Sequence, residues 1–343
     1  MILENCPNVA TFDASCKCER YLMQHSEIML SLSGGADSDI MLDFVQRVLK
    51  ENKFNYDCKI HYVWFDTGIE YQATKDHLKE LEDKYNIKIE RVRAKVPVPL
   101  GCKTYGLPFI SKFISQMIER LQNKNFDFKN DGWKSFEELD KKYPNTKGAL
   151  TWWTNSYLPK KGKSSVFNIK NTKFLKEFMI ENPPTFKISD KCCNGAKKNT
   201  SHDWEEKHNC DLKMLGLRFA EGGQRSTSIH SCFDDSKDTH IYRPIWWFTD
   251  KDKEEYKNFF NVQFSRCYTE YNLHRTGCAA CPFGSQFEQV LLELEKHEPM
   301  LFKAVTNIFG KSHEYTRAYR KFKKERAEQE KNGMVYGQIS IFD

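Results

Sequence analysis

Apolar residues along the first hundred positions alternate between short continuous runs and runs with helical spacing. Residues 27–33, EIMLSLS, predict a buried strand that ends at Gly34 and Gly35. From Asp37, the segment DSDIMLDFVQRVLKEN spaces its apolar residues along one helical face. The pattern then predicts a strand at 58–68, a helix at 71–86 and a strand at 87–98. This alternation indicates an α/β fold with a doubly wound, mostly parallel sheet.

The remaining chain is expected to contain a short helix at 14–25 and a helix near 109–123. Residues 211–223, DLKMLGLRFAEGG, repeat the strand-then-loop pattern. Helices are predicted at 285–297, 299–309 and 312–330. The expected organisation is a helical extension over 1–25, a main domain over 26–284 with an insertion at about 101–190, a helical C-terminal region over 285–332 and a tail over 333–343.

Composition and charge narrow the protein class. No stretch approaches the ~18 consecutive apolar residues that span a bilayer, and the first residues lack a basic-then-apolar signal. A cytoplasmic location is therefore expected, where twelve cysteines indicate metal binding or redox chemistry rather than disulfides. The net charge of +6 favours a polyanionic partner only mildly, and a soluble surface explains it equally well.

The sequence SLSGGADSD lies where the first predicted strand meets its helix, the position at which doubly wound folds bind ligands. Glycines let the backbone approach an anion, and amides at a helix N-terminus bind it. A tight strand-to-helix turn is the alternative explanation. The candidate ligand-binding residues of this loop are Ser33, Gly34, Gly35, Asp37 and Ser38.

Four cysteines form two close pairs. Cys192 and Cys193 are adjacent, whereas Cys278 and Cys281 form a CxxC turn between Gly277 and Pro282. Adjacent thiolates diverge and suit one zinc ion poorly, but a [4Fe-4S] cube offers four separate iron corners. The pairs therefore predict a cluster site, with zinc binding or buried thiols as the remaining alternatives.

Several segments together resemble one known family. SGGADS is similar to the pyrophosphate loop of the adenine-nucleotide alpha hydrolases, and WFDTGIEYQAT resembles a segment of their sulfonucleotide-reductase branch. CCNGAK followed by RTGCAACPFG resembles the cluster signature of the phosphoadenylyl-sulfate (PAPS) reductase family, which includes proteins of bacterial DNA phosphorothioation. GLRFAEGGQRS and YRPIWWFTDKDKEEY also match that family.

The resemblance implies an adenine nucleotide and a [4Fe-4S] cluster as cofactors. It places Asp66, Thr67 and Gly68 at the nucleotide and Lys197 beside the cluster. Arginines suit phosphate and sulfate oxyanions, although any one of them could instead form a salt bridge. The candidate arginines are Arg218, Arg225 and Arg275, and Asp37, Lys197, Arg218 and Arg225 are the predicted catalytic residues.

One feature of the reductases has no counterpart here. Their nucleophilic cysteine lies in a C-terminal tail, and no cysteine follows Cys281. The resemblance therefore favours ATP-dependent sulfur chemistry, in which ATP bound with Mg²⁺ adenylates an acceptor and pyrophosphate is released. DNA is a candidate acceptor. A sulfonucleotide reductase using another thiol is the alternative.

The last residues give a different indication. GQISIFD, with Gln338, Ile339, Ser340, Ile341 and Phe342, resembles the peptide by which bacterial replication proteins dock on the sliding clamp. A packed C-terminal strand would explain the same residues. Clamp docking would place the protein near DNA, so a non-catalytic nucleotide sensor associated with DNA is a third interpretation.

Overall fold

The structure is a computed structural model that describes residues 5–51, 56–158, 165–222 and 228–331. The chain divides into two compact units. The α/β unit comprises Met1–Val98, Cys193–Ala279 and Glu288–Lys303. The helical unit comprises Pro99–Cys192, Ala280–Phe287 and Ala304–Asp343. The domain boundaries expected from the sequence stay a prediction.

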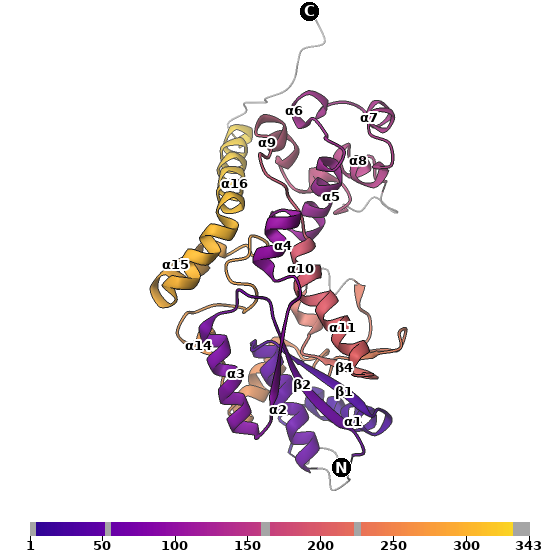
Figure 1. Cartoon of the computed structure of the whole chain (residues 1–343), viewed down its shortest axis with the longest axis vertical. Coiled ribbons are helices and arrows are strands. Elements are labelled where there is room, and N and C mark those ends of the chain that lie inside the picture. The colour runs from indigo at the N-terminus through magenta and orange to yellow at the C-terminus, as the bar shows by residue number, and fades with distance from the viewer. Residues whose placement is uncertain (1–4, 52–55, 159–164, 223–227, 332–343) are drawn as a thin grey trace, which may run out of the picture. The chain divides into compact units, whose positions relative to one another are not determined.

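A six-stranded sheet forms the centre of the α/β unit (Figure 1). Its order is β3-β2-β1-β4-β6-β5, and all neighbours are parallel except β5, which pairs antiparallel with β6. Leu30 of β1 lies opposite Tyr62 of β2 and Met214 of β4. The predicted α/β fold with a mostly parallel sheet is confirmed. The strands are β1 (Glu27–Leu32), β2 (Lys59–Asp66), β3 (Ile89–Arg93), β4 (Leu212–Leu215), β5 (Phe233–Asp234) and β6 (His240–Tyr242).

Both faces of the sheet are covered, which explains why β1 is a continuous apolar run. Ile28 and Leu30 belong to the core formed with α1 (Val9–Gln24), α2 (Ala36–Glu51) and α3 (Gln72–Tyr85). Met29 points to the other face, where it packs with Trp204 of α11 (Asn199–Lys207). Other short elements of this unit are the π-helix η3 (Asn194–Lys198), η4 (Phe219–Glu221), α13 (Asp250–Phe260) and α14 (Arg266–Thr269).

The helical unit has a separate aromatic core. Trp152 and Trp153 are fully buried there among Phe109, Phe178 and Leu139. Asp131, also fully buried, accepts hydrogen bonds from Lys134, Lys142 and Tyr143. The helices of this unit are α4 (Val98–Tyr105), α5 (Lys112–Gln122), α6 (Phe128–Asp131), α7 (Phe136–Lys142), α8 (Lys147–Trp153), η2 (Ile169–Asn171) and α9 (Leu175–Glu181).

The first residue of α4, Val98, belongs to the α/β unit. Three further helices contain residues of both units: α10 (Lys191–Cys193), α15 (Phe287–His297) and α16 (Pro299–Lys331). The sequence predicted two helices where the structure has the single α16, so that expectation was wrong. A helix of this length tolerates Gly310 in its interior because its neighbouring turns keep their hydrogen bonds. None of the helices in the described part of the chain is long and apolar enough to cross a lipid bilayer.

Capping residues account for two differences from expectation, one helix boundary and one helix that was not predicted. α1 begins at Val9 rather than near residue 14, since the Asn8 side chain accepts a hydrogen bond from the Thr11 amide at 2.9 Å. α13 was not predicted, yet Thr249 and Asp252 form a reciprocal capping box at its start. Both caps are visible in the sequence as short polar side chains before helical segments.

Replacing Gly310 with Ala should stabilise the protein by about 0.5–1 kcal/mol, because Ala loses less backbone entropy in a helix. An added methyl group there would meet no atom within 4 Å. Urea unfolding followed by circular dichroism measures the change. Gly132→Ala is the control and should destabilise the protein, since its methyl group would lie 2.4 Å from Ile180 and from the Phe128 carbonyl. Destabilisation by Gly310→Ala would instead indicate two helices that meet at this residue.

Candidate functional site

The chain changes direction in the sheet at β1. From β1 it proceeds to β2 and β3 on one side, and it later adds β4 on the other side. The loops that leave β1 and β4 therefore separate, which is where open parallel sheets bind ligands. A cavity of about 460 Å³ lies at this point. Its lining comes from the loop after β1, the end of β4, η3, α13 and the segment after α14.

The loop after β1 has a conformation that its sequence makes possible. The Ser33 amide donates a hydrogen bond to the Ser38 hydroxyl at 3.0 Å, which closes the turn into α2. Gly34 has a positive φ of 62°, and a Cβ atom there would lie 2.7 Å from Thr74 of α3. Ser33, Gly35, Asp37 and Ser38 line the cavity, whereas Gly34 is not among its lining residues. Ligand binding by this loop stays a prediction.

Gly216, directly after β4, was missed by the sequence analysis. A Cβ atom at Gly216 would lie 2.8 Å from both the Asp37 carbonyl oxygen and the Ser38 Cα atom. Glycine therefore permits the end of β4 to approach the first turn of α2. The sequence did contain a signal for this role, because Gly216 stands immediately after a predicted strand.

The cavity contains a network of charges around Asp37. Its carboxylate accepts from Arg218 at 2.9 Å and forms an ion pair with Lys253 at 2.6 Å. Arg218 also contacts Asp250 at 2.9 Å and is only 5% exposed, so its guanidinium is held in place. Lys197 and Arg275, both exposed, line the same cavity. Lys253 was not predicted, because its proximity to Asp37 depends on the packing of α13.

These side chains make the cavity suitable for an anion. Four of its lining residues are cationic and two are acidic. An excess of Lys and Arg in a concave site attracts phosphate or sulfate groups. The cations are Lys197, Arg218, Lys253 and Arg275, and the acids are Asp37 and Glu221.

Tyr268 is a second residue that the sequence analysis missed. Its hydroxyl oxygen accepts hydrogen bonds from the amides of Ala36 at 3.1 Å and Thr276 at 3.3 Å. Burial raises the pKa of Tyr268, so the phenol stays neutral. The hydroxyl therefore links the N-terminus of α2 to the segment that carries Arg275. No local pattern identifies this role, since 232 positions separate Tyr268 from Ala36.

A buried ion pair lies at the first turn of α2. Asp39, 1% exposed, accepts from Nε2 of His77 at 2.9 Å, and Nδ1 of His77 lies 3.3 Å from Glu80. Burial favours the neutral imidazole, but the two carboxylates outweigh it and raise the pKa of His77. This pair ties α3 to the helix that begins at the ligand-binding loop.

The DTG segment has a different environment from the one expected. Asp66 accepts hydrogen bonds from Arg91 and from the Gly68 amide. Burial alone would raise the pKa of Asp66, but these hydrogen bonds lower it overall. Asp66, Thr67 and Gly68 are not among the residues that line the 460 Å³ cavity. Their predicted contact with the nucleotide stays a proposal.

Thr67 instead connects this segment to the cysteines of the α/β unit. Its hydroxyl lies 2.6 Å from Glu70 and 3.8 Å from Sγ of Cys278. Burial raises the pKa of the Cys278 thiol, while Lys197 opposes this increase, and Cys193 is also close enough to affect it. Cys193, Cys278 and Lys197 thus interact electrostatically, and the predicted role of Lys197 beside a cluster stays a proposal.

The four candidate cysteines are distributed over both units. Cys193 and Cys278 belong to the α/β unit, and Cys192 and Cys281 to the helical unit. Within the described ranges, the twelve cysteines form no disulfide. No three His, Cys, Asp or Glu side chains among the described residues are grouped so that they could hold a metal ion.

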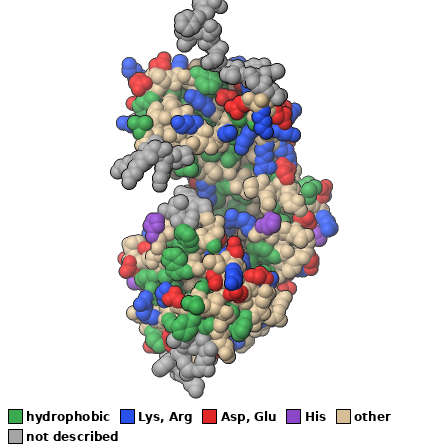
Figure 2. Space-filling view, turned by 180° about the vertical axis from the view of Figure 1, so that it is seen from behind, with side chains coloured by type: hydrophobic (Ala, Val, Ile, Leu, Met, Phe, Trp, Pro, Cys, Tyr) green, Lys and Arg blue, Asp and Glu red, His purple; other side chains and the backbone are tan. Residues whose placement is uncertain are grey.

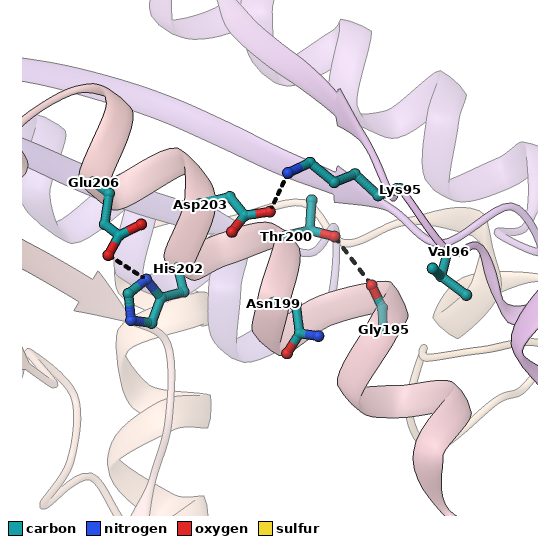
Figure 3. A pocket seen from close by; sticks show the side chains of 8 residues that line it. All are labelled: Lys95, Val96, Gly195, Asn199, Thr200, His202, Asp203 and Glu206. Atoms are coloured by element: carbon teal, nitrogen blue, oxygen red, sulfur yellow. Dashed lines mark hydrogen bonds and ion pairs between the residues drawn. The ribbon is translucent and has the colours of Figure 1, made fainter. Parts of the chain in front are cut away.

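The π-helix η3 follows the adjacent cysteines, and π-helical turns occur frequently at functional sites. A second cavity, of about 380 Å³, lies beside it (Figure 3). Figure 3 shows Lys95 paired with Asp203 and His202 paired with Glu206, at 2.6 Å and 3.4 Å. These charges satisfy one another, so this cavity lacks the excess of cations found in the first.

Two predictions fall outside the described residues. Arg225 lies in the segment 223–227, and the clamp-like peptide Gln338–Phe342 lies in 332–343. The contact of Arg225 with an oxyanion and the docking of the peptide on a sliding clamp therefore stay predictions.

Comparison with known proteins identifies one family segment. Residues 27–109 match the model described as the phosphoadenosine phosphosulfate reductase domain. The matched segment contains β1 to β3, the loop after β1 and the helices α2 to α4. No curated protein matches the chain.

Three solved structures are similar at 12% sequence identity each. Phosphoadenylyl-sulfate reductase from Candida auris has a TM-score of 0.38 over 78% of this chain and 85% of its own. The U34-tRNA thiolase NcsA from Methanococcus maripaludis, with its [4Fe-4S] cluster, has a TM-score of 0.35 over 91% of this chain and 79% of its own. NH₃-dependent NAD synthetase from Campylobacter jejuni has a TM-score of 0.32 over 88% of this chain and 95% of its own. The scores are low, and the fold follows from the sheet topology itself.

Replacing His77 with Gln should lower the free energy of unfolding by about 3–5 kcal/mol at pH 6, because it leaves the buried Asp39 carboxylate without its partner. The contribution of protonated His77 is fully present below its unfolded pKa of about 6.5 and is lost as the pH rises through the raised folded pKa. Urea unfolding should therefore show a smaller difference at pH 9. His202→Gln, at an exposed histidine, is the control. An equal loss at both pH values would mean that folded His77 is neutral.

Proposed function

We propose that this protein is an enzyme that binds an adenine nucleotide in the 460 Å³ cavity and uses it in sulfur chemistry. The observation that carries the proposal is the cation-rich cavity at the switch point of the sheet, formed around a glycine loop at the start of α2. The match of residues 27–109 to the phosphoadenosine phosphosulfate reductase domain supports the same ligand class.

The proposed nucleotide contacts follow from the lining of the cavity. The loop from Ser33 to Ser38 and the N-terminus of α2 would face the phosphates. Lys197, Lys253 and Arg275 would neutralise their charge, and Arg225 is proposed as a further oxyanion ligand. Asp37 would either stay paired with Arg218 and Lys253 or release them to hold Mg²⁺. Arg218 is therefore proposed mainly as a positioning residue.

The cysteines fit an iron–sulfur cluster in their chemistry. Cys192, Cys193, Cys278 and Cys281 would provide four thiolates, and the Thr67 hydroxyl and Lys197 would provide polar groups near Cys278. A bound [4Fe-4S] cluster would supply electron transfer or sulfur activation. Lys197 lines the nucleotide cavity and also affects the Cys278 thiol, so it is the residue proposed to connect the two sites.

In the proposed reaction, an acceptor oxygen attacks the α-phosphorus of ATP. A new phosphorus–oxygen bond forms, the bond to the β-phosphate oxygen breaks, and pyrophosphate leaves with its charge neutralised by the lysines and Arg275. Sulfur at the sulfide level, from a separate donor, then attacks the acceptor atom that bears the adenylated oxygen. The bond between that atom and the oxygen breaks, and AMP leaves. Pyrophosphate is a polyanion, so its release requires nearby cations, and the lining of the cavity provides them.

Reductive cleavage of a sulfonucleotide is the second candidate. The description of the matched domain favours it, because that domain belongs to phosphoadenosine phosphosulfate reductases. The same cations would bind the sulfate and phosphate oxygens of adenylyl sulfate. A thiolate would attack the sulfur and displace AMP, which gives a thiosulfonate. A second thiol, from an external reductant, would then release sulfite as a disulfide forms.

Anaerobically prepared protein should bind ATP, release pyrophosphate when an acceptor is present, and release AMP only when a sulfur donor is present as well. Product analysis after incubation with ATP or with adenylyl sulfate distinguishes the candidates, because sulfite release identifies the reductase. Gly216→Ala should weaken nucleotide binding by at least ~10-fold, since its methyl group displaces the first turn of α2. Gly277→Ala is the matched control, because it lines the same cavity and its methyl group meets nothing within 4 Å. Equal binding by both variants would exclude this cavity, and binding without products would indicate a sensor.

Anaerobic purification should also give a brown protein that absorbs near ~400 nm. Cys193→Ser should lower its iron and acid-labile sulfide content, because one thiolate ligand is lost. Cys16→Ser, at a partly exposed cysteine of α1, should leave both unchanged. A colourless protein loaded with zinc would contradict the cluster.

A further inference from the structure

The net charge of the chain conceals a strong difference between its two units. The helical unit carries 25 Lys and Arg against 14 Asp and Glu, a formal net charge of +11. The α/β unit, with the proposed nucleotide site, carries 28 against 33 and has a formal net charge of −5. Figure 2 shows Lys and Arg gathered over the helical unit, whereas charges of both signs mix over the α/β unit. Such a basic unit indicates a polyanionic ligand.

The helical unit also contains a cavity of its own, of about 320 Å³. This volume is at the lower end of the range, about 300–1,000 Å³, in which proteins hold small organic groups. All its lining residues belong to the helical unit. They are Trp133, Asn155, Ile169, Lys170, Thr172, Lys173, Phe174, Leu175, Lys176, Glu177 and Glu330.

An exposed aromatic ring forms part of this cavity. Trp133 is 65% exposed, although the neighbouring tryptophans Trp152 and Trp153 are fully buried in the core. The ammonium group of Lys176 lies 5.2 Å from the centre of the Trp133 ring and 5.6 Å from that of Trp153. This cation–π contact holds Lys176 beside Trp133 and leaves most of the Trp133 ring surface accessible.

Exposed cations and acceptors surround that ring. Lys170 and Lys173 are both exposed on the rim, and the Lys170 amide donates to the Asn155 side chain at 2.8 Å. Glu177 and Glu330 supply carboxylates, which accept hydrogen bonds from the amino groups of bases. The cavity therefore combines a ring for stacking, cations for phosphates and acceptors for a base edge.

The basic surface continues from the cavity along α16. The Tyr319 hydroxyl donates to the Lys173 carbonyl at 2.7 Å, which connects the rim to this helix. Arg317, Lys321 and Lys324 are exposed at the spacing of one helix face. No acidic residue occurs between Tyr315 and Lys324 in the sequence. A ligand longer than one nucleotide could therefore follow a run of cations.

We propose that the helical unit binds single-stranded nucleic acid, with an unpaired base stacked on Trp133 and the adjacent phosphates on Lys170 and Lys173. Single strands suit this surface because their bases are open to stacking, and stacking on an aromatic ring tolerates any sequence. In a duplex the bases are already stacked, so Trp133 would have no free base to contact. The proposal goes beyond the nucleotide chemistry above and uses none of its residues.

Fluorescence anisotropy with a labelled 20-nucleotide single strand tests this proposal, using DNA and RNA of the same sequence and the matching DNA duplex. The intact chain should bind at least one single strand more tightly than the duplex. Trp133→Ala should weaken that binding by roughly 5- to 150-fold, because base–aromatic stacking is worth about 1–3 kcal/mol. Trp133→Phe should retain most of the binding. The tighter of the DNA and RNA strands identifies the natural ligand class.

The charge contribution is tested separately. The double variant Lys170→Ala, Lys173→Ala should reduce the slope of log affinity against log salt by about 1.4, which corresponds to two lost phosphate contacts. Trp247→Ala is the matched control for Trp133, since Trp247 is 50% exposed on the α/β unit. Binding that is unchanged in Trp133→Ala, or equal for duplex and single strands, overturns the proposal. Binding is measured without ATP, so its result does not depend on the nucleotide chemistry.

Discussion

The close approach of the end of β4 to the first turn of α2 is the constraint on which the rest of the site depends. Gly216 leaves no room for a side chain against the Asp37 carbonyl and the Ser38 Cα atom. On the other side of the loop, Gly34 leaves none against Thr74 of α3. The loop is thus confined between two packed elements, and its backbone is organised before any ligand arrives.

Side chains from distant parts of the chain complete this organisation. Asp37 is held by Arg218 and Lys253, Tyr268 accepts from the Ala36 amide, and Asp39 pairs with His77. Each interaction fixes the start of α2 relative to a different neighbouring element. Because these contacts are made in the protein alone, little reorganisation of the loop is needed for an anion to bind.

The distribution of charge separates two kinds of recognition within one chain. The α/β unit is acidic overall, but four of its 28 Lys and Arg side chains converge on one cavity at the switch point. The helical unit carries a net positive charge and exposes Trp133 beside lysines. A small anion is bound by a few convergent cations, whereas a polymer needs an extended basic surface. The two units therefore suit ligands of different sizes.

The sequence by itself determined the local features of this protein. Continuous apolar runs and helical periodicity predicted β1, β2, β3 and the helices α2 and α3 between them, because strand and helix spacing depend on neighbouring residues. Gly34 and Gly35 indicated the turn into α2, whereas the metal site predicted from the paired cysteines stays a prediction. It did not predict that α16 is one helix, since interior glycine and a change of pattern there resemble a helix end.

Only the tertiary structure decided which distant residues act together. Lys253 and Tyr268 reach the loop through the packing of α13 and α14, and no local pattern carries that information. The opposite charges of the two units also became apparent only once residues 99–192 and 304–343 were grouped together. Contacts between residues far apart in sequence depend on how complete elements pack, which is a property of the whole chain.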